Sequence, residues 1–225
     1  IYTLSLHDAL PIYGHMAMLC YRFCKMAAWL RSQPFAHGDI KPDNIMVHPD
    51  GSLTLVDYDG MFVPAMKGQK SPTIGTKDFS HPLRTVDDFD ETIDDFALTS
   101  VALSLKAISL EPSLLDDYGA ADRLLFSAED YRDLSKSKAL AALQGLMNDE
   151  ETNTFLSMFL LAYAKKNLEM CSFNSFSLIN NLFGKGSIIS TEANEDDLSD
   201  CEIEDFVNYS KDGVKLLSAS FLKGT

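Results

Sequence analysis

The stretch that decides the fold is His37-Gly38-Asp39-Ile40-Lys41-Pro42-Asp43-Asn44. Two short, β-prone runs follow it at residues 45–47 and 53–56, and the pair Asp50-Gly51 lies in the gap between them. An Asp-Gly pair between two such runs is a strong signal for an antiparallel hairpin. The chain therefore leaves Asn44 and returns to Asp57 at the open end of a predicted hairpin.

Two oxygen ligands meet at that open end. Paired antiparallel strands lie about 5 Å apart, so the amide oxygen of Asn44 and the carboxylate of Asp57 can share one cation. Such ligands suit Mg²⁺, which takes one or two protein carboxylates and completes its shell with water and substrate phosphates. Asn44 and Asp57 are therefore the predicted metal ligands and cofactor-binding residues.

Two residues just upstream carry the predicted chemistry. Asp39 can accept the proton of an attacking hydroxyl group. Lys41 points the same way in an extended loop and can neutralise the charge that develops on a transferred phosphoryl group. Asp39 and Lys41 are therefore the catalytic candidates, and Lys41 is also a candidate for binding the cofactor.

The order of these residues resembles the catalytic loop and the metal-binding loop of the protein kinase superfamily, as in a bacterial Ser/Thr-kinase-like protein. In the family the metal-binding aspartate follows the asparagine by thirteen residues, which selects Asp57 over Asp59. The resemblance implies ATP and Mg²⁺ as cofactors and a protein as substrate. It implies phosphoryl transfer to a Ser or Thr hydroxyl group.

Several departures limit what the resemblance implies. Gly38 stands where the family has an arginine, so control by loop phosphorylation is not expected. Tyr58 takes the packing role of the family's phenylalanine. Asp59 is either a turn residue, which we favour, or an added metal or water ligand. His37 is expected to brace the backbone and not to act as a base.

The resemblance continues downstream. Residues 75–84 either shape a shelf for a peptide substrate or form a structural loop in which His81 and Arg84 make local hydrogen bonds. An apolar stretch that runs to residue 108 resembles the family's buried central helix. Asp94 at its start is expected to accept hydrogen bonds from the catalytic-loop backbone, with Asp95 as the alternative.

The predicted fold class is mainly α with a small β-hairpin, a protein-kinase-like C-lobe (α+β) with the N-lobe missing. Apolar residues at helical spacing predict further helices at residues 13–31, 138–147, 150–166 and 172–183. In the third of these, Phe155, Met158, Phe159, Leu161 and Ala162 are expected to face inward. No glycine-rich loop precedes His37, so this chain alone is expected to be inactive.

Four segments are predicted. Residues 1–12 match the translation of a sequencing-library adapter and are excluded from the fold. Residues 13–185 form the kinase-like C-lobe, and residues 186–205 form an acidic linker. Residues 206–225 begin a C-terminal β-hairpin that resembles the lead-in to a leucine-rich repeat domain.

Composition narrows the class of protein. The net charge of −14 argues against a nucleic-acid partner, and no run resembles a membrane span or a signal peptide. Cys20 and Cys24 lie four residues apart on a predicted helix and should pack in the core, while Cys171 and Cys201 complete no metal-site spacing. This cysteine usage favours the cytoplasm. The sequence indicates no oligomeric state.

Two other functions stay open. In small-molecule phosphotransferases of the aminoglycoside or choline type, His-Gly-Asp is usual, but the pair Lys41-Pro42 argues against that class. A pseudokinase could serve as a binding module, although retention of Asp39, Lys41, Asn44 and Asp57 argues against it.

Overall fold

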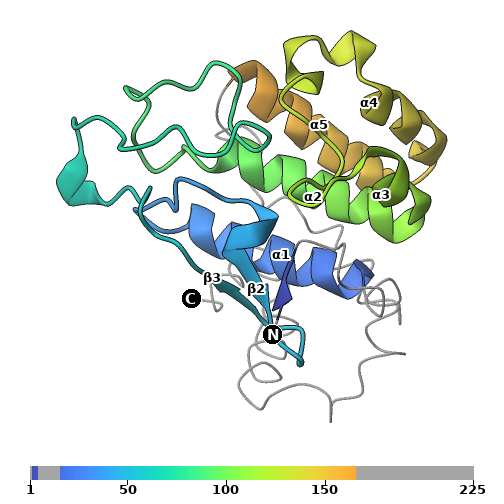
Figure 1. Cartoon of the computed structure of the whole chain (residues 1–225), viewed down its shortest axis with the longest axis horizontal. Helices are drawn as coiled ribbons and strands as arrows, with labels where there is room; N and C mark the ends of the chain where they lie inside the picture. The colour runs from blue at the N-terminus through green and yellow to red at the C-terminus, as the bar shows by residue number, and fades with distance from the viewer. Residues whose placement is uncertain (1, 5–15, 166–225) are drawn as a thin grey trace.

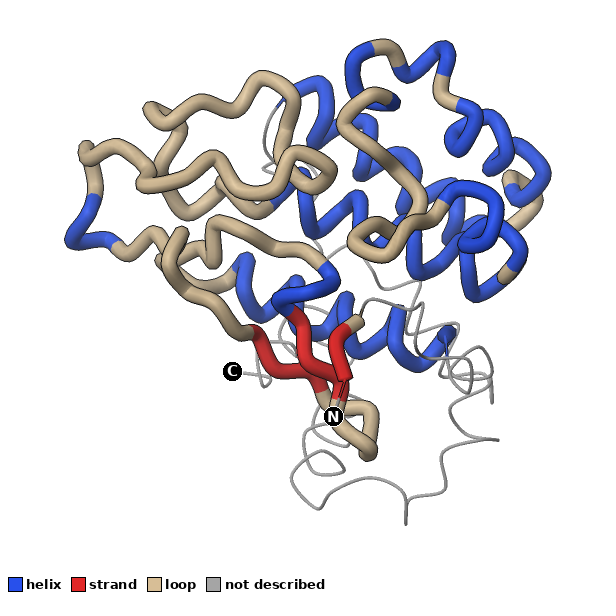
Figure 2. Tube along the Cα trace, viewed as in Figure 1, coloured by secondary structure: helices blue, strands red, loops and turns tan. Residues whose placement is uncertain are grey.

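The computed structural model describes residues 2–4 and 16–165 (Figure 1). In this part of the chain a small antiparallel sheet lies beside the first long helix, and the other helices gather farther from the sheet (Figure 2). The predicted helix at 172–183, the acidic linker, the C-terminal hairpin, Cys171 and Cys201 lie outside the described residues. The described fold is thus mainly helical, as the sequence predicts.

The α-helices are α1 (Met16–Arg31), α2 (Asp95–Leu110), α3 (Ser113–Tyr118), α4 (Lys138–Ala142) and α5 (Glu150–Lys165). Short 3₁₀ turns lie at Pro42–Asn44, Pro64–Met66, Asp130–Arg132, Leu134–Lys136 and Leu143–Leu146.

Most predicted helices are confirmed within the described residues. The helix predicted at 138–147 is shorter than expected, because α4 ends at Ala142 and the chain tightens into a 3₁₀ turn that contains Gly145. The six-residue helix α3 was not predicted, since one and a half turns are too short to display a helical period.

Helix α2 is the centre of the described fold. Figure 1 shows it between α1 and α5, and every residue from Asp95 to Ile108 is buried. Its polar side chains are satisfied internally: Ser104 donates to the carbonyl of Ser100 at 2.8 Å, and the Ser100 hydroxyl lies 2.9 Å from the Tyr131 hydroxyl. A helix that is buried on all sides is stable because its neighbours cover every face and its polar side chains have partners.

The two flanking helices each bury one face. On α1, Cys20 and Cys24 are free thiols packed in the core, as predicted. On α5, Phe155, Met158, Phe159 and Ala162 are buried, at positions that share a helical face. Leu161 was expected inward but is only half-buried, since it lies off that face.

The predicted hairpin is present. Strand β2 (Ile45–Val47) pairs antiparallel with β3 (Leu53–Leu55), with Ile45 opposite Leu55 and Val47 opposite Leu53. The turn between them includes Gly51 at φ +79, a conformation that glycine adopts without steric cost. The hairpin therefore carries the chain from Asn44 back to residue 56.

The sheet has a third strand, formed by residues that were excluded from the predicted fold. Strand β1 (Tyr2–Thr3) pairs with the other edge of β2, with Tyr2 opposite Val47. Leu4 is fully buried, and its N–H donates to the carbonyl of Ile45 at 2.8 Å. Residues 2–4 thus belong to the described fold, because they satisfy the exposed edge of β2 and fill a place in the core.

A long irregular segment connects β3 to α2. Phe62 and Ala36 exchange two backbone hydrogen bonds, at 2.9 and 3.1 Å, and the Phe62 ring packs edge-on against Phe89. This small apolar cluster fixes both ends of the segment next to residues 37–44. The segment can therefore contribute side chains to the site.

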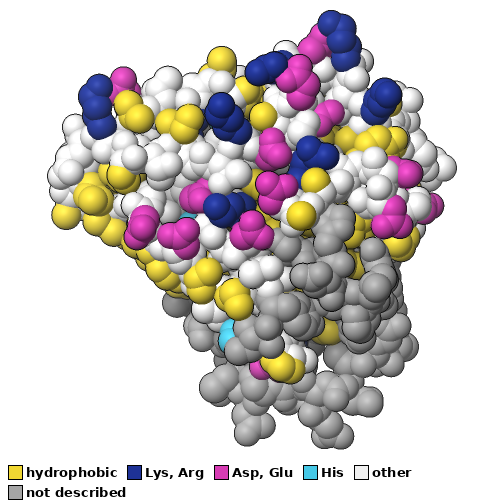
Figure 3. All heavy atoms as spheres, in the orientation of Figure 1, with side chains coloured by type: hydrophobic (Ala, Val, Ile, Leu, Met, Phe, Trp, Pro, Cys, Tyr) yellow, Lys and Arg dark blue, Asp and Glu magenta, His cyan; other side chains and the backbone are white. Residues whose placement is uncertain are grey.

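Charged side chains are mixed on the surface of the described residues. In the view of Figure 3, basic and acidic side chains of the described residues are interspersed across the face. Among the described helices, none combines the length and the apolar content needed to cross a bilayer.

A buried ion cluster joins α2 to the start of α5. The ammonium group of Lys106 lies 2.8 Å from a carboxylate oxygen of Glu151 and 3.2 Å from one of Asp149, and little of the lysine side chain is exposed. Removing Lys106 leaves the carboxylate of Glu151, whose side chain is mostly buried, without its cation.

We therefore expect Lys106→Ala to lower the free energy of unfolding by about 3 kcal/mol, measured by urea denaturation. Lys136→Ala is the matched control, because Lys136 makes an exposed pair with Asp133. The control should leave the unfolding midpoint nearly unchanged. Equal shifts in the two variants would contradict the structural role of the Lys106 cluster.

Candidate functional site

The loop of residues 37–44 is anchored to the helical core by Asp94. The carboxylate of Asp94 accepts the backbone N–H of His37 at 2.5 Å and that of Gly38 at 2.8 Å. Burial raises the pKa of Asp94, although the two N–H donors oppose that effect. Asp95 instead forms an ion pair with Arg31 at 2.6 Å. Asp94, and not Asp95, therefore has the orienting role that the sequence predicts.

His37 connects the loop to the hairpin. Its Nδ1 accepts the N–H of Asp39 at 3.3 Å, so the proton is assigned to Nε2, which lies 2.9 Å from the carbonyl oxygen of Val56. Both ring nitrogens are thus engaged with the backbone, and the residue is 1% exposed. This arrangement agrees with a bracing residue and leaves neither nitrogen for proton transfer.

Gly38 is required by close packing. Its φ is +88°, and a Cβ atom at this position would lie 2.0 Å from the carbonyl oxygen of Gly60. The loop therefore packs directly on the turn that follows Asp57. The absence of an arginine here, noted in the sequence, follows from this lack of space.

The two catalytic candidates are in contact. Lys41 Nζ lies 3.1 Å from Asp39 Oδ2, as their spacing in an extended loop predicts. Thr76 joins them: its N–H donates to Asp39 Oδ1 at 2.7 Å, and its hydroxyl accepts from Lys41 Nζ at 3.2 Å. Sequence reasoning missed Thr76, because it comes from an irregular segment with no periodicity. One signal was available in the sequence: Thr76 lies in residues 75–84, which were expected either to shape a shelf for a peptide substrate or to form a structural loop.

The environment of Asp39 favours its charged form. Burial alone would raise the pKa of Asp39, but the hydrogen bonds from Thr76 and Lys41 and the positive charge of Lys41 outweigh it. The pKa of Asp39 is therefore held below its usual value. At neutral pH the side chain is a carboxylate, which can orient a hydroxyl group and accept its proton.

Asn44 is fixed from the same side. Its amide nitrogen donates to the backbone oxygen of Asp39 at 2.9 Å and to Asp39 Oδ2 at 3.3 Å. These bonds occupy the Asn44 side-chain donor and leave the amide oxygen for a cation. The Asn44 carbonyl accepts the N–H of Val56 at 3.0 Å, which places Asp57 one residue beyond the paired position.

Asp57 is exposed and has a rare backbone conformation. It has φ +66°, the one positive φ among the described residues other than glycine. Aspartate tolerates this region better than most residues, and such conformations cluster at functional sites. The exposed carboxylate at the end of the hairpin agrees with the predicted ligand position.

The two predicted metal ligands, Asn44 and Asp57, suit a cation that keeps water among its ligands better than one enclosed by protein side chains. No group of three or more His, Cys, Asp or Glu side chains in the described ranges could hold a metal by itself. One amide oxygen and one carboxylate are too few for a closed metal site. They suit Mg²⁺ that keeps waters and substrate phosphates among its ligands.

The residues after Asp57 form a turn. The N–H of Met61 donates to the carbonyl of Tyr58 at 3.1 Å, with Asp59 and Gly60 at the central positions. This geometry favours the turn role of Asp59. Tyr58 is half-exposed: its ring packs on that of His37, with centroids 5.2 Å apart, and its hydroxyl donates to the carbonyl of Leu55 at 2.7 Å.

His81 and Arg84, in the segment before α2, make both local and distant hydrogen bonds. His81 Nδ1 accepts the N–H of Leu83 at 3.1 Å, and His81 Nε2 lies 2.7 Å from the carbonyl of Tyr163 on α5. Arg84 Nη1 donates to the carbonyl of Gly38 at 3.0 Å. The backbone N–H of Arg84 also donates to the carbonyl of His81 at 2.8 Å, so both residues make the expected local hydrogen bonds and, in addition, distant ones.

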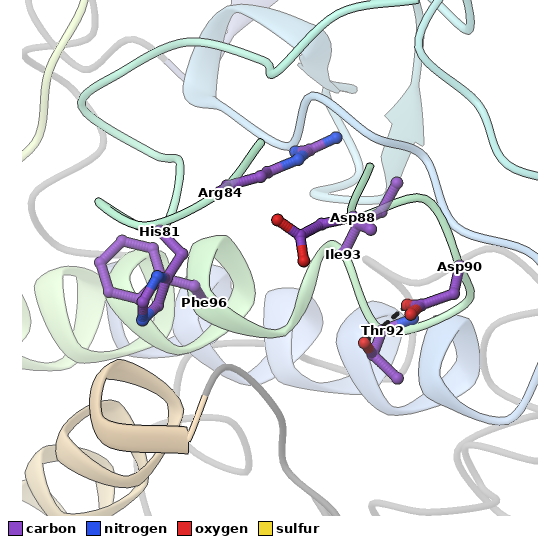
Figure 4. Close-up of a pocket in the computed structure, with 7 residues that line it drawn as sticks. All are labelled: His81, Arg84, Asp88, Asp90, Thr92, Ile93 and Phe96. Atoms are coloured by element: carbon purple, nitrogen blue, oxygen red, sulfur yellow. Dashed lines mark hydrogen bonds between the residues drawn. The ribbon is translucent and has the colours of Figure 1, made fainter. Parts of the chain in front are cut away.

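A pocket of about 180 Å³ adjoins this segment (Figure 4). It is lined by His81, Arg84, Asp88, Asp90, Thr92, Ile93 and Phe96. The candidates Asp39, Lys41, Asn44 and Asp57 do not line it. The predicted site and this pocket are therefore separate features.

The packing of Gly38 gives a test of the loop geometry. Gly38→Ala should destabilise the fold more than Gly68→Ala, measured by thermal unfolding. Gly68 also has a positive φ, +85°, but a Cβ atom added there would meet no other atom within 4 Å. The control therefore carries only the conformational strain of about 1 kcal/mol, while Gly38→Ala adds the collision with Gly60. Equal loss of stability would contradict the close packing.

Comparison with known proteins gives a limited result. The chain is 42% identical over 55 residues to sperm motility kinase 2A from Mus musculus. The match covers 24% of this chain and 11% of the length of that kinase. No family model and no solved structure matches the chain. The comparison supports a kinase-like relationship, and it gives no support to a bacterial source or to the adapter interpretation of residues 1–12.

Proposed function

We propose that this chain carries the catalytic loop and the metal-binding loop of a kinase-like C-lobe. Its proposed reaction is transfer of the γ-phosphoryl group of ATP to a Ser or Thr hydroxyl group of a protein. The observation that carries the proposal is the cluster of Asp39, Lys41 and Asn44. Their side chains meet within hydrogen-bonding distance, beside the hairpin end that bears Asp57.

Each side chain has a distinct part in this reaction. The Asp39 carboxylate orients the attacking hydroxyl group and accepts its proton. Its lowered pKa keeps the side chain ionised, as this role requires. Lys41 stabilises negative charge on the transferred group.

The remaining two residues hold the cation. Asn44 and Asp57 would bind Mg²⁺, which supplies charge neutralisation for the phosphates of ATP. The bonds from Asn44 to Asp39 link this cation site to the residue that orients the hydroxyl group. A shift of Asn44 would therefore disturb both parts of the site.

A matched pair of aspartates tests the metal assignment. In the protein expressed from its complete reading frame, Asp57→Asn should abolish Mg²⁺-dependent transfer, because the amide has no negative charge for the cation. Asparagine also tolerates a positive φ, so the fold should persist. Asp59→Asn should lower the initial rate far less. The rates are measured across a Mg²⁺ titration, and equal losses would show that the two aspartates act as a pair.

The role of Asp39 is tested by kinetics. Asp39→Ala should lower kcat by about 10² or more and leave the affinity for ATP within a few-fold, since the contact matters most in the transition state. Transfer to a generic basic protein gives kcat, and calorimetry gives the affinity. Asp43→Ala, which removes an exposed carboxylate from the same loop, is the control. A wild type as inactive as the mutant would indicate a binding module instead.

A further inference from the structure

The peptide group of Gly38 is held from both sides. Asp94 accepts its N–H at 2.8 Å, and Arg84 Nη1 donates to its carbonyl oxygen at 3.0 Å. The next residue along the chain is Asp39. Any rotation of the Gly38 carbonyl would therefore change the backbone direction at the proposed catalytic aspartate.

Arg84 is partly buried, and part of its guanidinium group is shielded from solvent. Its Nε and Nη2 atoms are shielded from solvent and have no hydrogen-bond partner among the described residues. Buried N–H groups without acceptors disfavour the folded state. Burial lowers the pKa of Arg84, and the nearby carboxylates of Asp94 and Asp39 oppose that shift. The arginine thus lies among the acidic groups of the site and not in an ordinary surface ion pair.

Position 38 itself has no room for a charged side chain. A Cβ atom at Gly38 would collide with Gly60, and the guanidinium group next to the Gly38 carbonyl comes from Arg84, 46 residues farther along the chain. Figure 4 shows the Arg84 side chain extending away from His81 and Phe96. The same segment carries Thr76, whose N–H holds Asp39 Oδ1. One segment therefore fixes both the backbone before Asp39 and its carboxylate.

We propose that Arg84 is a positioning residue for phosphoryl transfer, which clamps the Gly38 carbonyl and thereby fixes the direction of the Asp39 carboxylate. This inference rests on the proposed function for its catalytic consequence. The clamp itself is a property of the loop and can be measured without any activity. The orientation of the Asp39 side chain then depends on the position of residues 75–84, which carry both Thr76 and Arg84.

Hydrogen exchange of the 225-residue chain tests the clamp. In Arg84→Gln, the amides of residues 37–44 should exchange about 10-fold faster or more, because a bond from a charged donor is lost. The control is Arg123→Gln, since Arg123 also donates to a backbone carbonyl, that of Tyr118, far from the loop in sequence. Unchanged exchange in Arg84→Gln, or equal acceleration in the control, would overturn the clamp.

Kinetics of the protein from the complete reading frame test the catalytic consequence. Arg84→Gln should lower kcat on the order of 10- to 100-fold and leave KM for ATP within about 3-fold. Arg84→Lys should recover part of kcat, because the ammonium keeps one donor and the charge. A wild-type kcat in Arg84→Gln would overturn the positioning role.

The exchange experiment and the kinetic experiment together distinguish failure of the clamp from failure of the proposed function. Faster loop exchange in Arg84→Gln, with no transfer by wild type, would defeat the proposed function and leave the clamp supported. If Arg84→Gln does not fold, Arg84→Met decides, because methionine fills much of the same space and has no hydrogen-bond donor. Wild-type exchange and wild-type kcat in that variant would reduce Arg84 to a buried structural charge and overturn the proposal.

Discussion

Two hydrogen bonds from the backbone of His37 and Gly38 to the carboxylate of Asp94 support the rest of the site. Asp94 stands at the start of α2, the helix that α1 and α5 enclose. Its position is therefore set by the packing of the whole helical layer. Through this one side chain, an irregular loop acquires the rigidity of the core, which a preorganised site requires.

Burial divides the site into two kinds of residue. His37, Asn44 and Asp94 are at most 5% exposed, and each donates to or accepts from the backbone. Asp57, by contrast, is exposed at the end of the hairpin. The buried residues set the geometry, and the accessible one can meet a hydrated cation. The opposite arrangement would leave the bracing bonds open to competition from water.

The sequence could predict those parts of the site that depend on short spacings. The contact between Asp39 and Lys41 follows from two residues of extended chain, and the approach of Asn44 to Val56 follows from the hairpin. Thr76 and Arg84 reach the loop across 37 and 46 residues. Contacts of that range within irregular segments have no periodic signal, so only the folded chain reveals them.

The fold shows the same division. The helix α5 was predicted because an apolar face repeats along it, and α2 because a continuous apolar stretch resembles the family's buried central helix, whereas the six-residue α3 has too few turns to repeat. Strand β1 was missed for another reason. The adapter interpretation excluded residues 1–12 from the predicted fold, and a two-residue strand has too short a pattern to oppose that interpretation.

The backbone of Asp57 has a consequence for how this protein can change. A residue other than glycine at φ +66° carries a steric penalty that glycine would avoid. Replacement by glycine would thus relieve the backbone and remove the exposed carboxylate in one step. Stability and the proposed chemistry oppose each other at this position.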